Sequence, residues 1–275
     1  MIDATIRSSP IDTVSGHFRR RLNNVMPALV LSAGVLIFWE AIIRLSNVPT
    51  FVLPAPTGIV ASLVANWRGL ATAARATALE VLFGFVLSAM AGITVALIIV
   101  RFERFGRALY PLIVLFQNVP KVALAPIFIL WFGYDLAPKI LLIIVIAFFP
   151  VAIDMLAGLQ SVEPSFVALM RSVGASNGKI LLRVRIPHSL PHLMAGLKVA
   201  ITFSVIGAIV GEFAGANQGL GYVIQFASTQ LDTPLIFAAL VVVSVLGLAF
   251  YYVVEFGERV LVPWAPKFDP IQSAN

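Results

Sequence analysis

Apolar and polar stretches alternate along this chain at a spacing set by the thickness of a lipid bilayer. Six long apolar runs are separated by polar intervals. A run of about 20 apolar residues is long enough to cross a hydrocarbon core of about 30 Å as a helix. The pattern therefore predicts an all-α polytopic membrane protein with six transmembrane helices. The predicted spans are residues 28–45, 77–100, 109–132, 139–158, 192–213 and 235–256.

Composition supports a membrane protein and argues against a soluble one. Hydrophobic residues make up 60% of the 275 residues and charged residues only 12%, whereas an ordinary soluble domain carries about 25% charged residues. The net charge of +6 is spread between the apolar runs, so it indicates membrane orientation better than it indicates nucleic-acid binding. With no Cys, the chain has no disulfide, no thiol nucleophile and no Cys-ligated metal.

Basic residues divide unevenly between the two sides that the six spans define. Thirteen of the 19 Lys and Arg residues fall on the side that holds both chain ends, and cytoplasmic loops carry the excess of Lys and Arg. Both termini are therefore predicted to be cytoplasmic. Residues 1–27 form a mostly disordered cytoplasmic segment in this prediction, and residues 263–275 form a cytoplasmic tail. The four cations assigned to the outer side are Arg44, Arg68, Arg75 and Lys139.

The polar interval 163–191 lies between the fourth and fifth spans and contains four cations. Apolar residues recur at helical spacing on both sides of the break Gly174-Ala-Ser-Asn-Gly178, which predicts a helix, a turn and a second helix. This hairpin either covers the inner ends of the spans or docks into a partner protein. A plain cytoplasmic loop is the alternative, but it explains neither the two amphipathic turns nor the spacing of Gly and Pro.

The third span is interrupted at Asn118-Val119-Pro120-Lys121 and again at Pro126. A broken helix at membrane depth is tolerated where the break is buried in protein or lines a wet cavity. Lys121 would lie near the middle of the membrane, where a lone charge costs at least about 2.5 kcal/mol. Two accounts remain open. Lys121 faces a translocation path and attracts an anionic substrate, or it caps the carbonyl groups that Pro120 releases.

Two further groups of residues carry structural or functional signals. Gly84, Ser88 and Gly92 are four residues apart in the second span, and small residues at that spacing permit close contact between helices. Glu212 lies at the end of the fifth span, before Gly219-Leu220-Gly221-Tyr222. Its carboxylate either gates or contacts substrate at the outer mouth, or is held at the helix end by neighbouring backbone or a cation.

These motifs resemble the membrane permease subunits of bacterial binding-protein-dependent ABC importers. The cytoplasmic signature of that family is EAA, three residues, Gly, nine residues and Ile-x-Leu-Pro. Gly174 matches its glycine and residues 184–187 match its tail, while Ala168-Leu169-Met170 stands in place of the EAA triplet. The motifs that resemble the sulfonate, taurine, nitrate and thiamine-precursor branch are Trp39-Glu40, Leu53-Pro54-Ala55-Pro56, residues 120–133 (PKVALAPIFILWFG) and Gly219-Leu220-Gly221-Tyr222.

The resemblance implies the type I ABC importer permease fold, with a first helix and periplasmic loop at 28–72 and the permease core at 73–262. It implies alternating access in the bacterial inner membrane, in which a periplasmic binding protein delivers a small polar solute. ATP and magnesium would be held by a dimer of partner ATPase subunits and not by this chain. We expect the pore to form between two copies in a C2 homodimer, surrounded by lipid. The residues implied in ATPase coupling are Ala168, Arg171, Gly174, Ala175, Ile186 and Pro187, and those implied along the translocation path are Pro120, Lys121 and Glu212.

An ion-coupled carrier that acts without an ATPase is the alternative function. Such carriers usually show inverted repeats and paired carboxylates in their spans, whereas this sequence shows one broken span and few membrane acids. A membrane scaffold would explain the spans but neither the hairpin nor the break at Pro120. Since the three His residues do not cluster and neither paired carboxylates nor a Ser nucleophile motif is present, we expect no catalytic residue and no metal site.

Overall fold

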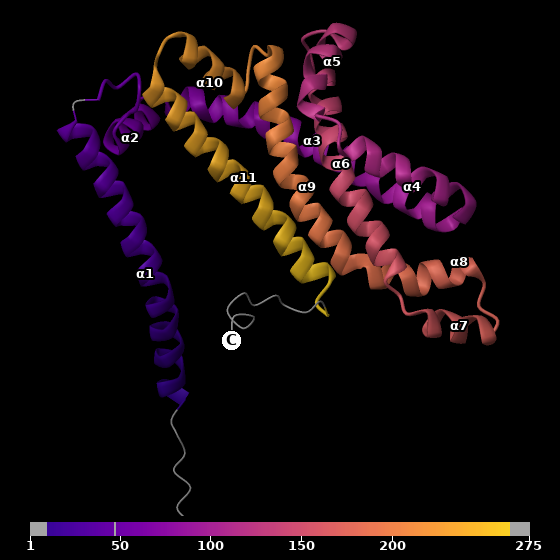
Figure 1. Ribbon diagram of the computed structural model, residues 1–275. Helices are drawn as coiled ribbons and strands as arrows, with labels where there is room; N and C mark the ends of the chain where they lie inside the picture. The colour runs from indigo at the N-terminus through magenta and orange to yellow at the C-terminus, as the bar shows by residue number, and fades with distance from the viewer. Residues whose placement is uncertain (1–9, 47, 265–275) are drawn as a thin grey trace, which may run out of the picture.

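The computed structural model describes residues 10–46 and 48–264 (Figure 1), and every regular element in those ranges is helical. The first part of the chain forms α1 (Pro10–Leu45), α2 (Pro56–Ala65) and the long α3 (Trp67–Arg101). The elements that follow are α4 (Glu103–Gln117), the 3-10 turn η1 (Lys121–Leu124), α5 (Ala125–Phe132), α6 (Leu136–Gln160), α7 (Pro164–Ser172), α8 (Asn177–Ile180), the π-helical turn η2 (Leu181–Arg185), α9 (Ile186–Gly215), α10 (Leu220–Thr229) and α11 (Thr233–Leu261).

Within the described residues, four helical segments are long and apolar enough to cross a membrane. They are α3, α6, α11 and the continuous helix 177–215 that α8, η2 and α9 form. Residues 108–117 and 121–132 make a fifth candidate, which is bent by 86° at the break. The predicted break in the third span is thus confirmed. The predicted first span, 28–45, lies in α1, and its crossing of the membrane stays a prediction, as does the total of six spans.

The core of the bundle lies where α3, α6 and α9 pack together. The predicted face of small residues on α3 allows α6 to pack closely against it. A Cβ on Gly84 would overlap Ile143 of α6, and a Cβ on Gly92 would overlap Val151. Gly196 of α9 approaches Asp154 of α6 in the same way. Small residues therefore set the distance between the three central helices.

The two ends of the central helices carry different structures. Figure 1 shows α7 and α8 at one end of α6 and α9, with α5 and α10 at the opposite end. Helix α1 extends away from the bundle in the same view, and it exposes large apolar side chains such as Leu31 (70%) and Ile37 (70%). Apolar surface of this size on a helix of a membrane protein is suited to contact with lipid or another helix.

One expectation from the sequence was wrong in detail, and the helices show two further features. Residues 10–27, expected to be mostly disordered, belong to α1, while residues 1–9 lie outside the described part. The second helix of the hairpin continues through Pro191 into the fifth span. Lys139, predicted at the outer start of the fourth span, lies in the first turn of α6 and is only 5% exposed. Its burial has a physical cause, which is an ion pair described below.

Candidate functional site: the hairpin, the broken span and a buried charged cluster

The predicted hairpin is present and its turn depends on Gly174. This residue follows the C-terminus of α7 with φ of +80°, a conformation that side-chain-bearing residues rarely adopt. The Ala175 N–H donates to the Met170 carbonyl (3.0 Å) and the Gly174 N–H donates to the Arg171 carbonyl (3.0 Å). These two bonds form a Schellman motif, which satisfies the last carbonyl groups of the helix. The glycine of the signature is thus required by the backbone at this turn.

Helix α7 has a buried face and an exposed apolar face. Val167 packs with Val162 and Ile180 in a small cluster beneath the hairpin. Phe166, Leu169 and Val173, which alternate with the buried positions, are 46%, 58% and 72% exposed. Of the six residues predicted for ATPase coupling, Ala168, Arg171, Gly174 and Pro187 are exposed, and Ala175 and Ile186 are half-buried.

The broken span places Lys121 against its own helix end. The Lys121 Nζ donates to the Gln117 carbonyl (2.6 Å), which loses its normal backbone donor where α4 ends before Pro120. The ammonium group also lies 4.6 Å from the centroid of the Phe149 ring, a cation–π distance. This geometry supports the capping account of Lys121. A role for Pro120 and Lys121 in the translocation path stays a prediction.

Glu212 lies in a buried polar cluster at the end of the bundle that carries α10. Its side chain is fully buried and accepts hydrogen bonds from the Thr77 hydroxyl (2.6 Å) and from the Gly221 N–H. The Thr77 hydroxyl oxygen in turn accepts from the Leu220 N–H (2.9 Å). Side chains of α3 and α9 therefore cap two backbone N–H groups at the start of α10 that have no partner within the helix. A carboxylate at a helix N-terminus is also electrostatically favourable.

Glycine makes this capping possible. Gly219, with φ of +109°, lies so close to the Glu212 carboxylate that a Cβ would overlap it, and Gly221 approaches the Glu212 Cβ in the same way. The Gly-Leu-Gly motif thus lets the backbone come within hydrogen-bonding distance of a buried carboxylate. The account of Glu212 as a carboxylate held by neighbouring backbone matches these contacts, and a direct contact with solute stays a prediction.

An ion pair that the sequence did not reveal adjoins this cluster. The Lys139 Nζ of α6 donates to Glu80 Oε1 of α3 at 2.6 Å, and both side chains are nearly fully buried. A second pair joins Lys198 of α9 to Glu258 of α11 at 2.7 Å, with both side chains about one-fifth exposed. The partners of these pairs are 59 and 60 residues apart. Sequence spacing therefore offered no signal for either pair, in contrast to the i,i+4 pair of Glu40 and Arg44 (2.6 Å).

A helical bundle with long apolar spans, one broken span and an amphipathic hairpin at one end is the architecture of the membrane subunit of a transporter. Residues 84–265 match the family described as the binding-protein-dependent transport system inner membrane component. The chain therefore belongs to this family, and it is the transmembrane permease subunit of an ABC importer for a small solute. The resemblance identified from its motifs is confirmed.

Several relatives whose names state the solute that they transport align over most of the chain. The formylaminopyrimidine transport permease protein ThiX of Halalkalibacterium halodurans is 36% identical over 85% of this chain and 93% of its own length. The riboflavin transport system permease protein RibX of Chloroflexus aurantiacus is 32% identical over 93% of this chain and 97% of its own length. The taurine transport system permease protein TauC of Escherichia coli is 28% identical, with coverages of 84% and 87%.

Solved structures show the same fold. An inward-facing structure of the MetNI methionine ABC transporter matches with a TM-score of 0.57 and 19% identity, over 71% of this chain and 95% of that chain. A crystal structure of an amino acid ABC transporter with histidines matches with a TM-score of 0.55 and 18% identity, over 72% and 96%. The predicted type I importer permease fold is therefore confirmed.

Proposed function

We propose that the α7–α8 hairpin docks onto a separate ATPase subunit and passes its movement to the membrane helices. The observation that supports this best is the two-sided packing of α7. One side is buried beneath the hairpin through Val167, while Phe166, Leu169 and Val173 stay exposed at the end of the bundle. An exposed apolar helix face is suited to a hydrophobic groove on a partner protein.

The proposal assigns the nucleotide chemistry to that partner. A dimer of ATPase subunits holds ATP and magnesium, and it contacts this chain through the region of Ala168, Arg171, Gly174, Ala175 and the Ile186-Pro187 pair. The hairpin then lies in the cytoplasm, and both chain termini lie on the same side. The end that carries α5 and α10 faces the periplasm, where a binding protein delivers the solute.

A second copy of this chain completes the translocation path in the proposal. Apolar side chains remain exposed on α1 and α11, for example Ile37 (70%) and Val245 (63%), and a C2 partner together with lipid would cover them. Glu212 is fully buried in this conformation, so it meets solute only if the outer end opens. In this hypothesis, the break in the third span brings Pro120 and Lys121 to the wall of the translocation path.

The cargo that we propose is a small pyrimidine-like solute. This is inferred from the relatives, since the permease named for formylaminopyrimidine is 36% identical and the one named for taurine is 28% identical. Sulfonate, taurine and nitrate are the other members of the predicted solute class. The cargo is tested by isothermal titration of the cognate binding protein with formylaminopyrimidine and with taurine, where tighter binding of taurine would overturn the proposal.

The ATPase-docking proposal is tested by purifying the tagged chain in mild detergent from its native membrane. We expect an ATP-binding cassette subunit to co-purify and the complex to hydrolyse ATP. Leu169→Asp places a charge on the exposed face of α7 and is expected to remove the ATPase from the complex. The matched control is Leu231→Asp, at an equally exposed position (66%) before α11 at the other end of the bundle.

The two variants give a direct decision. Loss of the ATPase in Leu169→Asp with retention in Leu231→Asp supports docking at the hairpin. Retention of both the ATPase and its hydrolysis in Leu169→Asp would contradict docking at this face. Purification of the wild-type chain without any ATPase and without ATP hydrolysis would overturn the proposal as a whole.

A further inference from the structure

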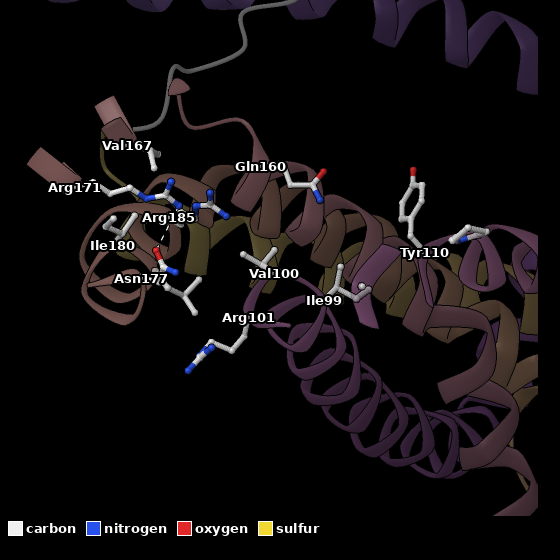
Figure 2. A pocket seen from close by; sticks show the side chains of 13 residues that line it. Ile99, Val100, Arg101, Tyr110, Gln160, Val167, Arg171, Asn177, Ile180 and Arg185 are labelled. Carbon is white, nitrogen blue, oxygen red and sulfur yellow. Dashed lines mark hydrogen bonds between the residues drawn. The ribbon is translucent and has the colours of Figure 1, made fainter. Parts of the chain in front are cut away.

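A cavity of about 550 Å³ lies between the hairpin and the adjacent ends of α3 and α4. Its polar lining includes Arg101 at the end of α3, Tyr110 of α4, Gln160 at the end of α6, and Arg171, Asn177 and Arg185 of the hairpin segment. Figure 2 shows the guanidinium groups of Arg171 and Arg185 near each other, with Arg101 on the opposite wall. Three cations from three separate elements thus face one space.

Among the described side chains, no carboxylate that lines the cavity neutralises these three charges. The described part of the lining contains Arg101, Arg171 and Arg185 but no Asp or Glu. None of them takes part in the four ion pairs found among the described side chains. Arg171 donates a hydrogen bond to the amide oxygen of Asn177 at 3.4 Å, which contributes no negative charge. Guanidinium groups gathered in this way form a site for an anion with several acceptor oxygens.

Apolar residues line the other part of the same cavity. Ile99 and Val100 belong to the last turn of α3, where the apolar span ends, and Pro111 lies in α4. Beyond the cavity, Leu115 and Phe116 on α4 are 64% and 58% exposed. The cavity therefore has a charged part beside the hairpin and an apolar part that continues along the exposed apolar surface of α4.

We propose that this cavity binds the phosphate headgroup of an anionic phospholipid from the membrane leaflet on the side of the hairpin. The three arginines contact the phosphodiester, and the acyl chains lie along the apolar surface of α4. Basic pockets between membrane helices on the cytoplasmic side recognise such headgroups. A soluble phosphate could bind the arginines, but it has no apolar group to contact the apolar part of the cavity. A phospholipid can contact both parts.

Arg171 belongs to the hairpin region proposed to contact the ATPase, but it lies on a different face of α7 from the exposed apolar residues that are proposed to dock. Arg171 is four residues after the buried Val167 and shares its side of α7, and both residues line the cavity. Phe166, Leu169 and Val173 project from the other side of the helix and stay exposed. A bound headgroup thus connects the hairpin to α3 and α4 without occupying the apolar face. The binding test uses the permease chain without an ATPase, so its result does not depend on the proposed function.

The experiment is native mass spectrometry of the purified full-length chain titrated with dioleoylphosphatidylglycerol or dioleoylphosphatidylcholine. We expect saturable binding of the phosphatidylglycerol at one site and no comparable binding of the phosphatidylcholine. Each of Arg101→Gln, Arg171→Gln and Arg185→Gln is expected to weaken that binding about fivefold, because one basic side chain contributes roughly 1 kcal/mol at an anionic lipid surface. The matched controls are Lys179→Gln and Arg183→Gln, which remove exposed cations of the hairpin segment outside the cavity lining.

Four outcomes would overturn the proposal. The controls could weaken binding as much as the three arginine variants do, which would mean general attraction of lipid to a basic surface. A large excess of inorganic phosphate could displace the lipid completely, which would assign the site to a soluble anion. Addition of the ATPase subunit could release the lipid, which would assign the arginines to carboxylates of that protein. Unchanged binding in all three single variants, each checked for folding by gel filtration and circular dichroism, would exclude this cavity.

Discussion

Replacing Lys139 with Met tests whether the buried ion pair stabilises the arrangement of α3 and α6. The side chains of Lys139 and Glu80 are 6% and 1% exposed and are joined at 2.6 Å. Met retains most of the length and the apolar contacts of Lys but removes the ammonium group. The Glu80 carboxylate then remains in the interior without its cation.

The expected cost follows from this burial. Removing one partner of a buried ion pair costs about 3 to 5 kcal/mol, because an uncompensated charge stays behind. A loss of this size lowers the midpoint of thermal unfolding by roughly 10 °C for a chain of this length. The matched control is Lys198→Met, whose pair with Glu258 is about one-fifth exposed. Since that pair is less buried, its loss is expected to cost less than the loss of the Lys139–Glu80 pair.

The assay is the loss of monodisperse protein on heating, followed by gel filtration in one detergent at a fixed heating time, since membrane proteins often unfold irreversibly. The double variant Glu80→Met/Lys139→Met removes both charges and is expected to recover most of the lost stability. Equal midpoints for Lys139→Met and Lys198→Met would refute the reasoning from burial. A double variant as unstable as Lys139→Met alone would show that lost packing, and not an unpaired carboxylate, caused the effect.

Three further predictions concern the turn, the helix cap and the broken span. Gly174→Pro cannot adopt φ of +80°, so we expect an inserted protein whose ATP hydrolysis no longer drives transport; normal transport in proteoliposomes would contradict this. Gly219→Ala places a Cβ against the Glu212 carboxylate and is expected to lower thermal stability by about 1 to 3 kcal/mol, while Gly58→Ala, at an open position, changes little. Lys121→Met loses the bond to the Gln117 carbonyl, and we expect about 1 kcal/mol less stability with unchanged KM for transport; a raised KM would favour the substrate-path account.

The sequence predicted the elements whose signals are local. Apolar runs of membrane length, the break before Lys121 and the Gly174 turn are each encoded within a few neighbouring residues, and the structure shows all three. The stripe of Gly84, Ser88 and Gly92 also predicted close helix contact correctly, because residues four apart share a helix face. The structure then identified Ile143 and Val151 of α6 as the side chains that fill this face.

The sequence could not identify the partners of the buried charges. Lys139 was placed at the outer start of the fourth span, but nothing near it in the sequence indicated its partner Glu80, which comes from a different helix 59 residues away. Glu212 was recognised as unusual, but its hydrogen bonds to Thr77 and Gly221 arise only when α3, α9 and α10 meet. Arg101 and Arg185 were counted only as orientation signals and Arg171 only as a coupling residue, because the cavity that they share forms only when α3 and the hairpin meet.

The sequence by itself determined that this chain is a helical membrane protein with a hairpin and a broken span, because hydrophobic periodicity and the constraints of Gly and Pro act over short distances. The tertiary structure alone decided which charges are paired, which cap a helix and which face a cavity. Those outcomes depend on the approach of helices that are far apart in the chain, and a buried charge is stabilised only by the group that packing brings to it.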